Sequence, residues 1–100
     1  MNVRFVWDPD KAESNLRKHG VSFPVAARVF ADPLRWTEVD RVADGEERWR
    51  IVSAVEGGRI LVVAYTTPET GDFLETVRII SARKAEPRER RRYERGNDDI

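Results

Sequence analysis

The chain of 100 residues is long enough for one domain and too short for a second independent core. Its 18 Lys and Arg residues balance 18 Asp and Glu residues, so the net charge of zero excludes any whole-molecule argument for binding nucleic acid or a membrane. The absence of cysteine excludes disulfides and thiolate metal sites, and a single histidine excludes a histidine cluster.

Two helices are predicted in the first third of the chain from signals at their starts. Asp8 and Pro9 favour a helix start, because the Asp side chain accepts hydrogen bonds from free backbone N–H groups and proline lacks the N–H that would stay unpaired there. This helix should end before Gly20, which can take the left-handed conformation of a helix end. Ser22 is an N-cap for a second helix over residues 23–31, in which apolar side chains recur at helical spacing.

Five segments are predicted as β-strands from their composition, namely residues 3–7, 34–39, 48–55, 59–65 and 73–81. The clearest pair is the third and fourth, which Gly57 and Gly58 join in a tight turn that needs positive φ angles. Residues 40–47 are expected to be a polar, acidic loop. The last helix is expected over residues 88–95, and residues 97–100 are expected to be a frayed tail.

The element order β-α-α-β-β-β-β-α indicates an α+β domain over residues 1–96, because consecutive strands with short turns form an antiparallel sheet that helices cover on one face. The two helices around Gly20 also resemble a helix-turn-helix DNA reader. We reject that interpretation because the second helix offers only Arg28 for reading bases and is otherwise composed for core packing.

The cellular location is predicted from what the sequence lacks. No signal peptide is recognisable at the N-terminus, and the longest apolar run, residues 60–65, is too short to span a bilayer. A cytoplasmic protein is therefore expected.

Positive charge is concentrated near the C-terminus. Residues 78–95 carry eight Lys or Arg and three Asp or Glu, whereas residues 1–75 carry ten and thirteen. A local basic region on a neutral protein points to an anionic ligand. The alternative is that the charge-rich final helix is only a solvated surface.

Several motifs together resemble the BrnT family of toxins, in order and between residues 3 and 95. The N-terminal motifs are Phe5-Val6-Trp7-Asp8-Pro9, Lys11 and Asn15-Leu16-Arg17-Lys18-His19-Gly20-Val21-Ser22-Phe23. The later motifs are Asp44-Gly45-Glu46-Glu47-Arg48-Trp49, Arg59-Ile60-Leu61-Val62-Val63, Arg78-Ile79-Ile80-Ser81-Ala82-Arg83-Lys84-Ala85, Arg88-Glu89-Arg90 and Tyr93.

The resemblance implies a type II toxin with a RelE-like fold, which acts as a metal-independent endoribonuclease without cofactors and so inhibits translation. It also implies an antitoxin of the BrnA type that holds the toxin inactive, forms a hetero-oligomer with it and carries the domain that binds operator DNA. The residues alone leave a second function open, a non-catalytic binding module that serves as antitoxin partner and corepressor, since both functions need arginines facing an anion. A third interpretation is a structural domain whose arginines make only surface ion pairs.

RNA cleavage without a metal needs a base for the 2′-hydroxyl proton, cations for the phosphate and an acid for the leaving oxygen. Arg78, Arg83 and Lys84 are the candidates for the phosphate, because a guanidinium holds two phosphate oxygens and stays charged. Arg83 and Lys84 should lie just past a strand end beside a helix start, where an oxyanion fits. The alternative for Arg78 is an ion pair with Glu75 or Glu47 on a solvated sheet face.

Five more residues are candidates for the site. Histidine titrates near neutrality, so His19 is a candidate acid or base, although its place at a helix end also suits a partner of the helix dipole. Glu47, with a second glutamate before it, is a candidate carboxylate base. Arg59 and Arg88 are candidates for binding RNA phosphates, and Tyr93 for supporting the phosphate or stacking on a base.

Overall fold

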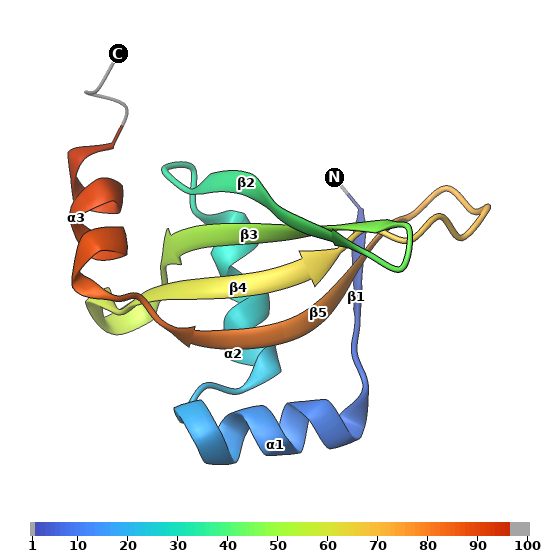
Figure 1. Ribbon diagram of the computed structural model, residues 1–100, viewed down its shortest axis with the longest axis horizontal. Helices are drawn as coiled ribbons and strands as arrows, with labels where there is room; N and C mark the ends of the chain where they lie inside the picture. The colour runs from blue at the N-terminus through green and yellow to red at the C-terminus, as the bar shows by residue number, and fades with distance from the viewer. Residues whose placement is uncertain (1, 97–100) are drawn as a thin grey trace.

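The computed structural model describes residues 2–96, which form a mixed α+β fold with one five-stranded sheet and three α-helices (Figure 1). The strands are β1 (Val3–Val6), β2 (Trp36–Ala43), β3 (Glu46–Ala54), β4 (Ile60–Thr66) and β5 (Glu75–Lys84). The helices are α1 (Pro9–His19), α2 (Phe23–Ala27) and α3 (Pro87–Arg95), and two short 3₁₀ segments are η1 (Arg28–Ala31) and η2 (Glu56–Gly58). The tail predicted to be frayed, residues 97–100, lies outside the described residues. Within residues 2–96 no helix is long and apolar enough to cross a membrane.

The capping signals in the sequence start and end α1 where they were expected. The side chain of Asp8 accepts from the backbone N–H of Asp10 at 2.8 Å, and Gly20 ends the helix with φ 70°. Ser22 begins α2 by accepting from the backbone N–H of Val25 at 3.3 Å. The predicted second helix is α-helical only in its first half, because the chain continues as the 3₁₀ segment η1.

The strands lie in the order β1-β5-β4-β3-β2, and β1 runs parallel to β5. The prediction of a wholly antiparallel sheet is therefore wrong for this pair. Both helices and the two hairpins separate β1 from β5 along the chain, so no tight turn imposes an antiparallel register on them. The other neighbouring strands are antiparallel, as expected.

Two strand boundaries also differ from the prediction. The expected loop over residues 40–47 is a hairpin, in which β2 and β3 are joined by Asp44 and Gly45 with φ of 53° and 75°. Positive φ at both central residues is what a two-residue hairpin turn needs, and Asp-Gly supplies it. Strand β5 starts later than predicted and continues to Lys84, so Arg83 and Lys84 lie inside the strand and not past its end.

Apolar side chains pack on both faces of the sheet. On one face, here called the helical face, α1, α2 and η1 cover a core that includes Ile51, Leu61 and Val63. On the opposite face, here called the α3 face, Tyr93 packs on a smaller cluster formed by Val52, Ile60 and Val62. The prediction that helices cover one face is wrong for α3, which lies at one end of the sheet and away from α1 (Figure 1).

Candidate functional site

The α3 face is rich in arginine. Side chains two residues apart along a strand share a face, and so do partners directly opposite on neighbouring strands. Because Val52 and Val62 lie on the α3 face, the strand register assigns five arginines to that face, namely Arg41, Arg48, Arg50, Arg78 and Arg83. The helices α1 and α2 pack on the opposite face, so they do not cover these five arginines.

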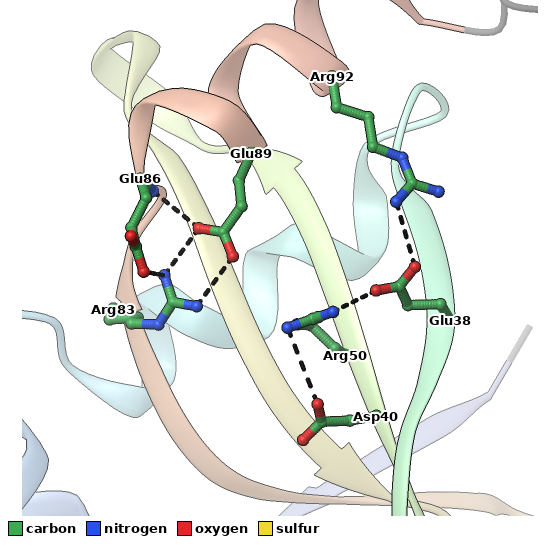
Figure 2. Close-up of polar contacts among 7 residues, drawn as sticks. All are labelled: Glu38, Asp40, Arg50, Arg83, Glu86, Glu89 and Arg92. Carbon is green, nitrogen blue, oxygen red and sulfur yellow. Dashed lines mark hydrogen bonds and ion pairs between the residues drawn. The ribbon is translucent and has the colours of Figure 1, made fainter.

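Arg83 is bound to the first turn of α3 (Figure 2). Its Nη1 and Nη2 donate to Oε1 and Oε2 of Glu89 at 2.8 and 2.9 Å, in a bidentate pair. Glu89 Oε1 also accepts from the backbone N–H of Glu86 at 2.7 Å, which completes a capping box at the start of α3. The hydrogen bond to Arg83 lowers the pKa of Glu89, and the same bond raises the pKa of Arg83. Arg83 therefore fastens α3 to the sheet.

A second set of contacts joins β2, β3 and the middle of α3 (Figure 2). Glu38 accepts from Arg50 and, at 3.2 Å, from Arg92, while Asp40 lies 3.8 Å from Arg50. The guanidinium of Arg92 also stacks over the ring of Trp36, 3.8 Å from its centre. The hydrogen bond from Arg50 lowers the pKa of Glu38. Arg50 and Arg92 are thus neutralised by carboxylates of the chain itself.

Arg78 lies on the open part of the α3 face, away from α3. Its nearest carboxylate is Glu46 of β3, at 3.8 Å, and both side chains are about half exposed at 48% and 43%. The predicted alternative partners, Glu75 and Glu47, do not pair with it. Glu47 lies opposite Val42 and is one residue from Glu46, so it faces the helical side of the sheet. The structure therefore places Glu46 beside Arg78 and leaves the predicted base Glu47 on the other face.

The structure does not bring the predicted phosphate-binding group together. Arg78 and Arg83 share a face but lie five residues apart along β5, which is roughly 15 Å of extended chain. Lys84 lies opposite Leu61, a residue of the helical face. His19 is exposed at the end of α1, on the helical side. The structure therefore does not gather Arg78, Arg83 and Lys84 at one place, because Arg78 and Arg83 lie far apart along β5 and alternation puts Lys84 on the other face.

The remaining candidates have different surroundings. Arg59 follows η2, and its carbonyl accepts from the backbone N–H of Val55 at 2.8 Å. Arg88 is exposed in the first turn of α3, where it lines an open cavity of about 560 Å³ with Trp36. The hydroxyl of Tyr93 donates to Asp32, and its ring packs in the cluster under α3, so both parts of this side chain are already engaged.

Asp32 is the centre of the contacts that hold Tyr93. It accepts from Ser53 Oγ at 2.9 Å and from the backbone N–H of Ala54 at 3.0 Å, besides the tyrosine hydroxyl. Burial raises the pKa of Asp32, but these hydrogen bonds and one from the backbone N–H of Leu34 together outweigh it, and the pKa is lowered. Sequence reasoning missed this residue as well as Glu38, Arg50 and Glu89, because their partners lie on other elements.

The fold and this face define a small α+β protein that carries an arginine-rich, partly uncovered sheet face, a surface suited to an anionic partner. Within residues 2–96 no group of three or more His, Asp or Glu side chains is arranged to hold a metal ion.

Comparison with known proteins identifies the family. Residues 7–89 match the family model of BrnT, described as the ribonuclease toxin of a type II toxin–antitoxin system, and the chain belongs to this family. The fold is similar to the 1.1 Å crystal structure of the Brucella abortus ribonuclease toxin BrnT, with a TM-score of 0.60 and 24% identity over 84% of this chain and 97% of that chain. Comparison with curated proteins gave no match. The protein is thus a ribonuclease toxin of a type II toxin–antitoxin system.

Proposed function

We propose that residues 1–96 form one RelE-like toxin domain, an endoribonuclease that cleaves RNA without a metal by attack of a 2′-hydroxyl on the neighbouring phosphate. Cleavage of cytoplasmic RNA by this domain inhibits translation. The membership in a family of ribonuclease toxins supports the substrate class. The observation that carries the mechanism is the pair formed by Arg78 and Glu46 on the open part of the α3 face.

This pair supplies two of the three groups that the reaction needs. The guanidinium of Arg78 binds the oxygens of the scissile phosphate and stabilises the negative charge that grows on them. The carboxylate of Glu46 takes the proton of the 2′-hydroxyl. The nitrogen of Arg78 and the oxygen of Glu46 lie 3.8 Å apart, which is beyond hydrogen-bonding distance, so a substrate can replace this weak contact. The 2.8 Å contact between Arg83 and Glu89 is a hydrogen bond and is harder to replace.

The bonds change as follows. The 2′-oxygen forms a bond to phosphorus, and the bond between phosphorus and the 5′-oxygen breaks. The 5′-oxygen takes a proton from water, and Glu46 returns its proton to solvent. The products are a 2′,3′-cyclic phosphate and a 5′-hydroxyl end.

The partner of the toxin is an antitoxin, which we propose to be of the BrnA type. That protein holds the toxin inactive in a hetero-oligomer and carries the domain that binds operator DNA. The arginines of the α3 face support this role as well, because an acidic segment of the antitoxin that covers them would exclude RNA.

The test compares two adjacent glutamates. Glu46→Gln and Glu47→Gln each remove one negative charge, but on opposite faces of the sheet. We expect Glu46→Gln and Arg78→Ala to slow cleavage of a single-stranded RNA by about a hundredfold or more, and Glu47→Gln to leave it unchanged. The ends are mapped for a 2′,3′-cyclic phosphate, and the assay is repeated with EDTA. Equal activity of Glu46→Gln and the wild type, or loss of cleavage in EDTA, would contradict the proposal.

A further inference from the structure

Two arginines face each other across β2 and β3. Arg41 and Arg48 are direct partners in the antiparallel register, which resumes at Arg41 after an irregularity that begins at Val39. Like charges directly opposite on neighbouring strands destabilise a sheet. Neither side chain has a hydrogen bond or an ion pair to another side chain within residues 2–96. Nothing in the described chain therefore compensates this contact.

The pair continues a row across the sheet. Trp49 lies opposite Tyr65, so one step further along the antiparallel register Arg48 lies beside Thr66, and Thr66 is the partner of Arg78. Neighbouring strands are about 4.8 Å apart, so Arg48 and Arg78 start roughly 10 Å from each other. We call Arg41, Arg48, Thr66 and Arg78 the arginine row.

The threonine at the centre of the row is a second, independent observation. Thr66 is only 1% exposed, and its hydroxyl oxygen has no hydrogen-bond partner within residues 2–96. Buried hydroxyl groups in folded proteins are almost always paired, because an unpaired one costs about 1–3 kcal/mol. The row thus holds an unused hydrogen-bonding group in addition to its uncompensated charge.

The arginines under α3 differ from those of the arginine row in their carboxylate partners. Arg50 and Arg83 each have a carboxylate within hydrogen-bonding distance, whereas the three arginines of the row share only Glu46, at 3.8 Å from Arg78. Three cations with one distant carboxylate leave a net positive strip that an anion can neutralise. A chain of phosphates crossing the strands would meet these cations one after another.

We propose that Arg41 and Arg48 together bind the phosphate next to the scissile one in single-stranded RNA, while Arg78 holds the scissile phosphate. This inference rests on the proposed function and names a substrate contact that the sequence did not indicate. The two guanidinium groups share one phosphate, which relieves their mutual repulsion. Substrate binding therefore needs a second phosphate beyond the one that is cleaved.

The experiment measures binding without cleavage. The probe is a single-stranded 2′-O-methyl RNA, which lacks the attacking hydroxyl, and its affinity is measured at several salt concentrations. For single strands the slope of log K against log salt is about 0.7 per phosphate contact. We expect the double variant Arg41→Gln/Arg48→Gln to lower this slope by about 0.7 and to bind roughly tenfold more weakly at low salt. The double variant Lys11→Gln/Arg17→Gln on α1, which also removes two exposed positive charges, is the matched control and should change neither value.

The thermal midpoint separates a binding role from a structural one. Because the substitutions remove a like-charge contact, the double variant should melt at the same temperature as the wild type or higher. A lower midpoint or an unchanged salt slope for the double variant would overturn the inference. If the wild type fails to cleave any RNA while binding of the probe still depends on Arg41 and Arg48, the proposed mechanism fails and the phosphate contact stands.

Discussion

The attachment of α3 to the sheet can be tested through one side chain. Glu89 accepts two hydrogen bonds from Arg83 and a third from the backbone of Glu86. Glu89→Ala removes all three contacts and leaves the guanidinium of Arg83 without its bidentate partner. We expect a clear loss of stability, because the side chain of Glu89 is only 17% exposed and that of Arg83 is 32% exposed.

The magnitude follows from the separate contacts. A hydrogen bond to a charged group contributes about 1.5–3 kcal/mol, and the partial exposure of this pair favours about 1.5 kcal/mol for the bidentate contact. Loss of a helix cap costs about 1 kcal/mol more. The free energy of unfolding should fall by about 2.5 kcal/mol, which lowers the thermal midpoint of a domain of this size by roughly 10–20 °C.

One further variant separates the contribution of the ion pair from that of the helix cap, and another serves as a control. Glu89→Gln keeps an oxygen that accepts from the backbone of Glu86 but loses the charge, so about 1.5 kcal/mol should be lost and the cap retained. Glu94→Ala removes an exposed glutamate of the same helix and should change stability by less than about 0.5 kcal/mol. The measurement is urea denaturation followed by circular dichroism. A loss below 0.5 kcal/mol for Glu89→Ala, on the order of the control, would refute the view that Arg83 fastens α3.

Three more predictions concern the core and acid stability. Asn15→Ala should lower the free energy of unfolding, measured by urea denaturation, by about 3 kcal/mol. The reason is that the side chain of Asn15 accepts from the N–H of buried Ala82 at 3.1 Å and donates to its carbonyl at 2.8 Å. A loss under about 1 kcal/mol would contradict this. Tyr93→Phe should cost about 1 kcal/mol by removing the hydrogen bond to Asp32, and an unchanged thermal midpoint would argue against that bond. The pKa values of Asp32 and Glu38 are lowered, so each carboxylate contributes stability that is present above its ordinary pKa and is lost as the pH falls through the folded value. Stability should therefore be nearly constant between about pH 7 and 5 and fall below about pH 4, and a maximum at pH 3 would exclude this linkage.

The elements that sequence reasoning located well are those fixed by local chemistry. Asp8 and Gly20 set the ends of α1 through contacts within a few residues, and such contacts are visible in a sequence. The parallel pairing of β1 with β5 depends on segments some seventy residues apart, as in Val3 opposite Glu75, and no local pattern specifies it. The two-residue turn at Asp44 and Gly45 lies between these cases, because the Asp-Gly signal was present in a segment whose polarity indicated a loop.

The residues of the candidate site also fall into those that the local sequence indicates and those that depend on contacts between distant segments. Arg78 was found because a guanidinium holds two phosphate oxygens and stays charged, a property that the residue type alone indicates. Glu46 and Glu47 could not be told apart until the turn was known, since a shift of one residue moves every side chain to the other face. The partnership of Arg83 with Glu89 joins a strand to a helix across a bend, which no periodic pattern encodes.

The balance of charge on the α3 face has a consequence for function. A protein with zero net charge can still attract RNA if its carboxylates neutralise some arginines and leave others unpaired. Here Glu89 binds Arg83 and Glu38 binds Arg50, whereas Arg41 and Arg48 of the arginine row have no carboxylate partner among the described residues. Within the sheet, the uncompensated positive charge therefore lies on the arginine row. Any loosening of α3 would free the cation of Arg83 and extend the positive strip toward the helix, whereas Arg50 would keep its partner Glu38 on β2. Variants that weaken α3, such as Glu89→Gln, should then bind the uncleavable RNA more tightly even as they lose stability, because the two properties compete for the same guanidinium group.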